Sequence, residues 1–506
     1  MNKRLNIIYT SDTHGRLSAY DFLNQNYGSF GLSRLPNYLK TLETSYLLLD
    51  NGDFLQGSPL LDYSRKQNLL HPVAKVLNAI HYDYVTVGNH DFNYGLPYLN
   101  SFQSSYQGEI LCANIYKDNK PYFKTHVIHE IDGIKVAIIG VTTEFIPFWE
   151  KPENLKGLVF LDVVETTKKV IKDNDLKNKS DLIVVMYHGG FNKDLNTHQA
   201  YGPDTIENKG YELFQIKDID VLLTGHQHIP QIYKNNQKVA LQTSHNAKDF
   251  GLIAISFDQD HNQSIDAKII SLSEYAIDEN IEQLINDDIK KTNSFLSQTI
   301  GIIKNDMHIS SPLDCRIKKH PLFQLINQIQ LEYTKADISM ASLPNETHGF
   351  PKEITLNDIA VNFPFENDLV VLEVTGSILK EALEQNASYF DIKENQIVIN
   401  SRFLFPKVEH YNYDVYDGIE YVIDASKPIG ERITSLTYKN KTIHPEDTFK
   451  LALNSYRAIG SGGFEMFKKA KRVIAYPVSY FDLIKDYIEA HPVLDFELIE
   501  NFKVIK

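Results

Sequence analysis

Histidine and carboxylate side chains follow short apolar segments at five points in the first half of this 506-residue chain. The apolar segments are rich in β-branched and aliphatic residues, as buried strands are. The five motifs are Asp12-Thr13-His14, Gly52-Asp53, Gly88-Asn89-His90-Asp91, His188-Gly189 and Gly225-His226-Gln227-His228. Because ligands of α/β sheets gather beyond the carboxyl ends of strands, we expect these side chains to meet at one sheet edge. Donors crowded in this way repel one another, and a pair of divalent cations would hold them together.

Two of the motifs place donors two residues apart: Asp12 with His14, and His226 with His228. In an extended backbone such residues point to the same side. Either motif taken by itself is more often a loop cap or a core histidine than a metal ligand. The recurrence of all five motifs after strand-like segments favours the metal site, because independent features then agree.

The donor types narrow the choice of ion. Asp53 can bridge two cations with its two oxygens, and the preceding Gly52 allows the backbone to come close to the site. Asn89 offers a neutral oxygen where an anionic substrate must bind. Nitrogen and oxygen donors without thiolate favour Mn, Fe, Zn or Co over a calcium site. Five further histidines lack this context and are expected on the surface or in packing: His71, His81, His126, His129 and His245.

Strand-like and helical segments alternate along residues 1–257, and they would position the motifs. This alternation predicts a mixed or parallel sheet covered by helices. Residues 278–299 carry apolar side chains at helical spacing, which predicts one long helix between domains. The chain beyond it has an α+β pattern. We therefore expect a domain at 1–275 that carries the motifs, a connecting helix at 276–302 and a second domain at 303–506.

The net charge of −14 disfavours a nucleic-acid polymer or an anionic membrane surface as a partner. Cys112 and Cys315 are too few and too far apart for a disulfide framework. The apolar stretch behind Lys3 and Arg4 is shorter than the roughly 7–15 residues of a secretory segment, and no run approaches the ~18 apolar residues of a membrane span. We therefore expect a cytoplasmic protein. Unconventional export or an anchor on another subunit stays open, as does the oligomeric state.

Residues 5–257 resemble the calcineurin-like metallophosphoesterases, in which D-x-H, G-D, G-N-H-D/E, H and G-H-x-H carry a dinuclear centre. The C-terminal part is similar to the substrate-binding domain of bacterial periplasmic 5'-nucleotidases. The resemblance is closest to the 2',3'-cyclic-nucleotide 2'-phosphodiesterase/3'-nucleotidase branch, through DNGDFLQGSPLLDY, GNHDFNYGLPYL, YNYDVYDGIEYVID, RITSLTYKNKTIHPEDTF and LNSYRAIG. It implies an α/β domain built as a layered αββα sandwich, followed by an α+β substrate-binding domain and joined to it by a long helix.

The resemblance also implies a role for each motif residue. One divalent ion would be held by Asp12, His14, Asp53 and His228, and the other by Asp53, Asn89, His188 and His226. His90 would be the catalytic histidine. Mn is the preferred metal, with Zn, Fe, Co or Mg as alternatives. A hydroxide bridging the two ions would attack phosphorus in line with the leaving ribose oxygen.

Two departures from the 5'-nucleotidase pattern favour the cyclic-phosphodiesterase branch. The 5'-nucleotidases have an aspartate three residues after the catalytic histidine, and this chain has Asn93 there. An asparagine can orient His90 but cannot stabilise its imidazolium as a carboxylate does. The 5'-nucleotidases also share an N-G-G-G-I-R-like turn, where this chain has ASLPNETHGF.

The resemblance implies a small nucleotide as substrate, with its base stacked between two aromatic rings of the second domain. The aligned positions are Phe365 and Tyr456, although both rings could instead belong to the core. The expected activity opens 2',3'-cyclic nucleotides and then dephosphorylates 3'-nucleotides. The alternatives are a 5'-nucleotidase or nucleotide-sugar hydrolase of the same fold, and a catalytically inactive nucleotide-binding protein. We disfavour the inactive protein because all seven metal-ligand positions are retained. Rotation of the domains, as in relatives, stays a hypothesis.

Overall fold

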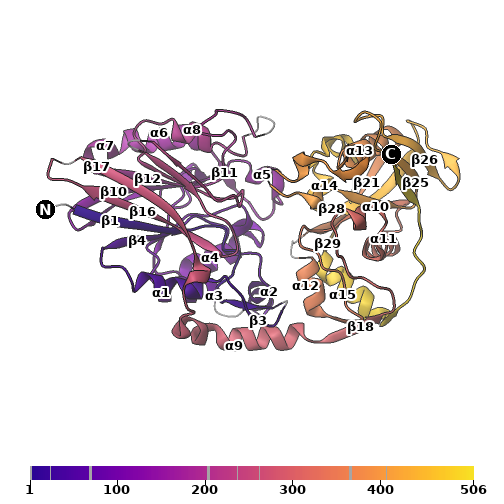
Figure 1. Ribbon diagram of the computed structural model, residues 1–506, viewed down its shortest axis with the longest axis horizontal. Coiled ribbons are helices and arrows are strands. Elements are labelled where there is room, and N and C mark those ends of the chain that lie inside the picture. The colour runs from indigo at the N-terminus through magenta and orange to yellow at the C-terminus, as the bar shows by residue number, and fades with distance from the viewer. Residues whose placement is uncertain are drawn as a thin grey trace. The chain divides into compact units, whose positions relative to one another are not determined.

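The computed structural model describes residues 3–22, 24–67, 71–201, 206–235, 238–260, 262–363, 367–405 and 407–506. The chain divides into two compact units, Met1–Asn293 and Ser294–Lys506. The division falls within the long helix α9 (Glu279–Leu296), which lies where the sequence predicts a helix (Figure 1). The expected α/β domain, long helix and α+β domain are confirmed, while the domain limits at 275 and 303 stay predictions. None of the described helices is long and apolar enough to cross a lipid bilayer.

Two six-stranded sheets form the centre of the first unit. The strands of the first sheet, in spatial order, are β17 (Gln263–Ser271), β16 (Asp249–Phe257), β1 (Lys3–Thr10), β4 (Tyr46–Asp50), β5 (Tyr84–Val85) and β6 (Glu109–Ile110). Those of the second sheet are β14 (Gln231–Lys234), β15 (Val239–Gln242), β13 (Val221–Thr224), β12 (Leu182–His188), β10 (Ile134–Thr142) and β9 (His126–Ile131).

Parallel strands carry the predicted motifs in both sheets. In the first sheet β1, β4, β5 and β6 are parallel neighbours. In the second sheet β10, β12, β13 and β15 are parallel neighbours, with antiparallel strands at both edges. The carboxyl ends of parallel neighbours lie at the same edge, so the loops that follow them come together.

Alternating side chains along the strands build the layers. Ile7 in the first sheet and Val136 and Val184 in the second belong to the core between the sheets. The intervening Ala137 and Val185 belong to a separate core on the outer face of the second sheet. This period of two is what strands buried on both faces require.

Helices cover both outer faces, which confirms the expected αββα sandwich (Figure 1). Over the second sheet lie α6 (Val163–Asp173), α7 (Leu176–Lys179) and α8 (Gly210–Phe214). On the other side lie α1 (Leu35–Leu39), α3 (Pro72–Ile80) and α4 (Gly95–Ser105). Asp162 precedes helix α6, and its side chain accepts a hydrogen bond from the backbone of Glu165 and so caps the helix.

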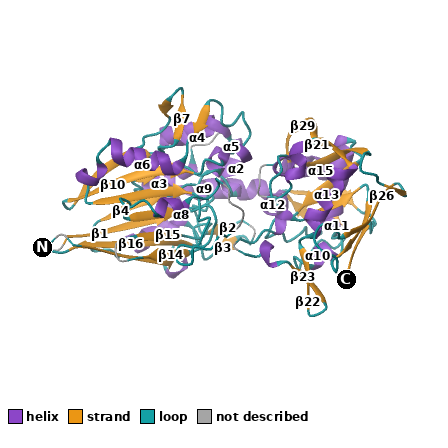
Figure 2. Cartoon of the chain, turned by 90° about the horizontal axis from the view of Figure 1, so that it is seen from above, coloured by secondary structure: helices purple, strands orange, loops and turns teal. Residues whose placement is uncertain are grey.

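The second unit is built around a five-stranded mixed sheet. Its strands, in spatial order, are β24 (Asp414–Asp417), β19 (Ile338–Ser342), β28 (Thr448–Asn454), β21 (Asp368–Thr375) and β29 (Lys471–Ser479). Its longer helices are α11 (Pro321–Thr334), α12 (Leu356–Asn362), α13 (Gly376–Ala387) and α15 (Tyr480–Ala490). The smaller sheets contain β18 (Thr299–Ile303), β20 (Glu353–Thr355) and β30 (Val493–Leu494), and β25 (Glu420–Asp424), β26 (Ile433–Tyr438), β27 (Lys441–Thr442) and β31 (Phe502–Ile505). A hairpin of β22 (Phe390–Lys393) and β23 (Gln396–Ile399) projects from the unit (Figure 2).

Candidate metal centre

Every predicted motif lies at the carboxyl end of a parallel strand. The motifs begin one to three residues after the ends of β1, β4, β5 and β13, and His188 is the last residue of β12. Two groups of side chains form there: Asp12 with His14 and His228, and Asp53 with His188 and His226. Within each group the potential ligand atoms lie within 4.8 Å of one another. The expected convergence is therefore present, but the expectation of a single sheet is wrong, because β1, β4 and β5 belong to the first sheet and β12 and β13 to the second.

Strained backbone brings these side chains together. Five of the seven predicted ligands have positive φ: Asp12 (54°), His14 (47°), Asp53 (60°), His226 (71°) and His228 (62°). The expectation that the two-residue spacing acts through extended backbone is therefore wrong. Left-handed conformations in residues with a Cβ cost about 1–2 kcal/mol each. Such strain accumulates where surrounding contacts enforce it, and it is concentrated at functional sites.

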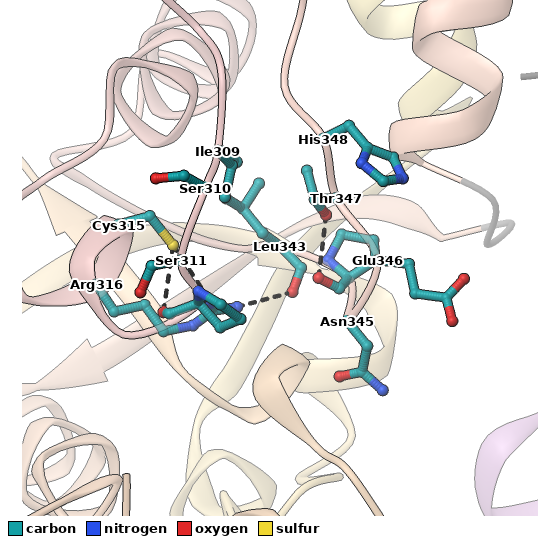
Figure 3. Close-up of a pocket in the computed structure, with 12 residues that line it drawn as sticks. Ile309, Ser310, Ser311, Cys315, Arg316, Leu343, Asn345, Glu346, Thr347 and His348 are labelled. Atoms are coloured by element: carbon teal, nitrogen blue, oxygen red, sulfur yellow. Dashed lines mark hydrogen bonds between the residues drawn. The ribbon is translucent and has the colours of Figure 1, made fainter. Parts of the chain in front are cut away.

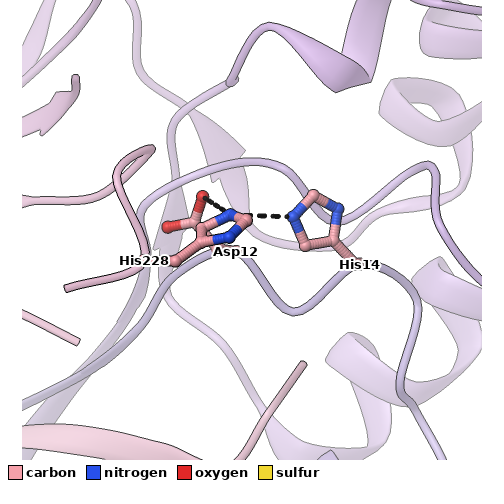
Figure 4. A group of neighbouring side chains, drawn as sticks. All are labelled: Asp12, His14 and His228. Carbon is pink, nitrogen blue, oxygen red and sulfur yellow. Dashed lines mark hydrogen bonds and ion pairs between the residues drawn. The ribbon is translucent and has the colours of Figure 1, made fainter. Parts of the chain in front are cut away.

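The first group contains two histidines whose ring nitrogens face each other (Figure 4). His14 Nε2 lies 3.2 Å from His228 Nε2, which is 3.3 Å from a carboxylate oxygen of Asp12. His14 Nδ1 lies 3.2 Å from the carbonyl oxygen of Gln56. Because a carbonyl only accepts, Nδ1 carries the hydrogen and the neutral His14 ring turns an Nε2 lone pair toward His228.

His188 in the second group has the same polarity. Its Nδ1 donates to the carbonyl oxygen of Asn51 at 2.7 Å, so Nε2 holds the lone pair of the neutral ring. This Nε2 is buried and lies 3.2 Å from a carboxylate oxygen of Asp53. Burial lowers the pKa of His188, but the Asp53 carboxylate outweighs it and raises this pKa to about 10. A proton or a cation at Nε2 would satisfy both of these acceptors.

In His226 the outer ring nitrogen is held by a carboxylate rather than by a backbone carbonyl. Its Nε2 donates to Glu207 at 3.0 Å, and its Nδ1 faces the side-chain oxygen of Asn89 at 2.9 Å. In the neutral His226 ring the hydrogen is then on Nε2, so the Nδ1 lone pair faces the Asn89 oxygen, which is also an acceptor. An outer acceptor that fixes the hydrogen on one nitrogen and points the other inward is the usual support of a metal-binding histidine.

The donor set fits divalent cations for these reasons. His188 and His226 point lone pairs at oxygen acceptors, which is unfavourable unless a cation or a proton lies between them, and His14 turns its lone pair toward His228 Nε2. The two groups supply nitrogen and carboxylate oxygen, and neither contains sulfur. Such donors suit Mn, Fe, Zn and Co better than they suit soft metal ions, which prefer sulfur ligands.

Backbone contacts hold the loops of the two parallel strands β1 and β4 together. The backbone N–H groups of Asp12 and His14 donate to the carbonyl oxygens of Gly52 and Asp53, both at 2.9 Å. A Cβ at Gly52 would lie 2.5 Å from the backbone nitrogen of Gly88, so this position requires glycine, as the sequence predicts.

Asp91 of the third motif has a structural role that its motif does not reveal. Its carboxylate accepts backbone hydrogen bonds from Asp53, Phe54, Leu55 and Gly88 at 2.7–3.0 Å. Burial, followed by repulsion from Asp53, raises the pKa of Asp91 to about 6. Asp91 thus ties the loop after β4 to the loop after β5.

His90 begins the 3₁₀ turn η2 (His90–Phe92) beside the two groups. Its backbone N–H donates to Asp53 Oδ1 at 2.7 Å, and its ring centroid lies 5.4 Å from that of His14. Its Nδ1 lies 2.8 Å from Asn93 Oδ1, so asparagine orients the ring as expected. The roles of His90 and of the seven ligands stay predictions.

Three residues at this site were not predicted from sequence. Glu207 carries no strand-plus-histidine signal. Trp149, whose ring lies 5.3 Å from that of His226, follows no motif either. His245 stacks on His228, with centroids 4.5 Å apart and planes 13° apart. His245 could have been singled out, because it follows β15, a parallel neighbour of β13.

The two positions predicted to bind the base are Phe365 and Tyr456. Phe365 is outside the described residues. Tyr456 lies in the short helix α14 (Ser455–Ala458), is half-buried, and meets Tyr411 edge-on with centroids 6.3 Å apart. A stacking role for either ring stays a prediction.

The second unit also has a cavity of about 280 Å³, shown in Figure 3. Segments 309–312 and 343–348, together with Cys315 and Arg316, line it, and Tyr456 is not one of the lining residues. The Arg316 guanidinium donates to the carbonyl oxygens of Pro312, Leu343 and His410, so its charge is bound mainly by backbone.

Two family models match the chain. Residues 5–230 match calcineurin-like phosphoesterase, and residues 299–469 match the C-terminal domain of 5'-nucleotidase. A Staphylococcus aureus crystal structure with alpha-ketoglutarate, provisionally named a 5'-nucleotidase, is 32% identical, with a TM-score of 0.93 and complete coverage of both chains. The chain belongs to the 5'-nucleotidase family of calcineurin-like phosphoesterases.

Two curated relatives represent different branches of this family. One, from Yersinia enterocolitica, is named 2',3'-cyclic-nucleotide 2'-phosphodiesterase/3'-nucleotidase; it is 28% identical, and the match covers 96% of this chain and 85% of the relative. A 5'-nucleotidase from Vibrio vulnificus is 22% identical, with coverage of 97% and 91%. Membership of the family makes the protein a hydrolytic enzyme and implies divalent metal ions.

Proposed function

We propose that this enzyme hydrolyses phosphoesters of small nucleotides at the loop edge of its first unit. One ion is held by Asp12, His14, Asp53 and His228, and the other by Asp53, Asn89, His188 and His226. The observation that carries this proposal is the shared polarity of His14, His188 and His226. Each has its outer nitrogen fixed by an acceptor and its inner nitrogen turned into the cluster. Mn is the preferred metal, with Zn, Fe, Co or Mg as alternatives.

The residues divide the chemistry between them. Divalent ions, when bound, supply Lewis acidity toward the phosphoryl group. Asp53 belongs to both ligand sets, and its carboxylate accepts from the backbone N–H of His90, which fixes the distance between that residue and the ligands. With its Nδ1 hydrogen donated to Asn93, the His90 ring takes up a proton only at Nε2, and as imidazolium it donates that proton from Nε2. That proton goes to a phosphoryl oxygen or to the leaving ribose oxygen.

The preferred substrates are 2',3'-cyclic nucleotides, opened to the 3'-monophosphate, followed by hydrolysis of the 3'-monoester. Asn93 supports this branch, because the histidine partner is neutral where 5'-nucleotidases have a carboxylate. The name of the Yersinia relative supports it as well. A 5'-nucleotidase is the second candidate, supported by the Vibrio relative. The cytoplasmic location stays a prediction from sequence.

One assay separates these candidates. Turnover of 2',3'-cAMP, 3'-AMP, 5'-AMP and a UDP-sugar is compared in the presence of Mn²⁺, with chelated enzyme as the blank. We expect 2',3'-cAMP and 3'-AMP to be hydrolysed fastest. A strong preference for 5'-AMP would reverse the choice of branch, and no turnover by metal-loaded protein would favour the inactive binding protein.

His90→Asn tests the assigned proton donor. General acid–base groups contribute on the order of 10²–10⁴ in rate, so kcat should fall within that range while metal content stays unchanged. Loss of metal in this variant would instead make His90 a ligand.

A further inference from the structure

Glu150 lies behind His90, two hydrogen bonds away. It caps the end of helix α5 (Ile146–Trp149), far in sequence from the third motif. His90 Nδ1 is 2.8 Å from Asn93 Oδ1, and Asn93 Nδ2 donates to Glu150 Oε2 at 2.6 Å. No predicted motif contains Glu150, and the proposed function assigns it no task.

The Glu150 carboxylate is held in place by donors on its other oxygen. Oε1 accepts from the backbone of Lys151 at 2.7 Å and from Asn154 Nδ2 at 2.8 Å. Asn154 Nδ2 also donates to the backbone oxygen of Asn93 at 2.9 Å. The carboxylate and the Asn93 backbone are thus fixed to the same side chain.

The direction of these bonds follows from donor and acceptor types. An ionised carboxylate only accepts, so Asn93 must turn its NH₂ group to Glu150 and its oxygen to His90. The amide oxygen also only accepts, so His90 must carry hydrogen on Nδ1. The lone pair of the neutral ring is then on Nε2. Without the carboxylate, the Asn93 amide could turn over, and the hydrogen of the neutral ring would move to Nε2.

We propose that Glu150 is a positioning residue, which fixes the direction of the Asn93 amide and through it the tautomer of His90. The inference rests on the proposed function, in which His90 acts on the phosphoryl group. In the 5'-nucleotidase pattern an aspartate contacts the histidine directly, whereas here the Asn93 amide lies between His90 and the Glu150 carboxylate. The neutral amide transmits orientation from that carboxylate, while the negative charge stays two hydrogen bonds from the ring.

Exchange of the two side-chain types gives a test. Glu150→Gln replaces an acceptor with a group that can also donate, so the Asn93 amide loses its fixed direction. We expect kcat to fall on the order of tenfold, a part of what a general acid–base group contributes, with KM and metal content unchanged. Asn93→Asp places two carboxylates at hydrogen-bonding distance and should lower kcat further.

The double variant Asn93→Asp/Glu150→Gln exchanges the amide and the carboxylate, so that each hydrogen bond again joins a donor to an acceptor. The new amide donates to the new carboxylate, which accepts from His90 Nδ1. We expect its kcat to exceed that of Asn93→Asp, so the two losses do not multiply. Glu165→Gln, an exposed change in α6, is the matched control and should leave kcat unchanged. Turnover is expressed per metal-loaded site, so partial unfolding does not mimic the effect.

Two outcomes overturn the inference: an unchanged kcat in Glu150→Gln, or a double variant whose loss equals the product of the single losses. His90→Asn, measured in parallel, separates this failure from that of the proposed function. If His90→Asn leaves kcat unchanged, the role of His90 itself is wrong. If His90→Asn lowers kcat, while the loss in the Asn93→Asp/Glu150→Gln double variant equals the product of the two single losses, only the positioning role is wrong.

Discussion

Buried charge in the second unit is compensated within the protein, whereas the ligand cluster of the first unit is not. Arg457 is 1% exposed, and its guanidinium lies 3.0 Å from the Asp414 carboxylate. Its guanidinium also donates to the side chain of Asn412 at 3.2 Å and to the carbonyl oxygens of Tyr411 and Ser461, both at 2.9 Å. Positive charge, negative charge and acceptors are all present, so this network supports the fold with no added ligand.

The cluster in the first unit has the opposite arrangement. His14 and His228 face each other through ring nitrogens 3.2 Å apart, and His188 faces the Asp53 carboxylate at the same distance. Left-handed backbone adds strain at several of these positions. Lone pairs and carboxylates that converge under strain gain stability from a bound cation, whereas the Arg457 network already contains its own cation. The pairing of buried groups therefore separates a structural network from a ligand site.

The largest expected effect comes from breaking the paired network. Arg457→Met leaves the Asp414 carboxylate buried without its counter-charge, and removal of one partner of a buried pair costs about 3–5 kcal/mol. We expect that loss in the free energy of unfolding of the second unit, measured by native-state hydrogen exchange. Metal content of the first unit should stay unchanged.

Arg457→Met/Asp414→Leu is the control for this loss. It removes both charges and should recover most of the stability, since no unpaired charge remains. Wild-type stability in Arg457→Met by itself would show that the ion pair does not support the second unit.

A smaller effect is expected at the outer support of the cluster. Glu207→Gln no longer fixes the hydrogen on His226 Nε2, and loss of such a partner lowers metal affinity about 10–100-fold. A Mn²⁺ titration of the stripped protein measures it, with Glu274→Gln, an exposed change, as the control. Equal affinity in Glu207→Gln and wild type would mean that His226 does not bind metal through Nδ1.

The smallest effect is expected on binding of the nucleotide base. Tyr456→Ala should raise KM for nucleotides about fivefold, which corresponds to about 1 kcal/mol of lost stacking, and should spare a small aryl phosphate. Tyr456→Phe keeps the ring and should behave like wild type. Equal losses on nucleotide and aryl phosphate would assign Tyr456 to packing.

The positions of the motifs were predictable from sequence because each follows an apolar, β-branched segment. Asp12 after β1 and His188 at the end of β12 illustrate this rule. The same rule would have reached His245 after β15. The backbone conformation was not predictable, because the positive φ of Asp12 and His14 depends on hydrogen bonds to the distant loop at Gly52 and Asp53.

The supporting carboxylates could not be predicted either. Glu207 and Glu150 lie in segments without periodic pattern or motif, and their partners His226 and Asn93 are brought to them only by the fold. The long helix over 278–299 was predictable, because its apolar spacing is independent of tertiary contacts, and it forms as α9. Local pattern thus reports elements and their ends, while the support of a site depends on contacts between distant segments.

The metal content of the intact chain tests the central claim most directly. Purified protein is loaded with Mn²⁺, freed of weakly bound metal by dialysis, and measured by elemental analysis beside Asp53→Asn. We predict two ions per chain in the wild type and a loss of at least one in the variant, with the fold retained by circular dichroism. A folded, metal-free chain that still hydrolyses nucleotides at the full rate would contradict the account.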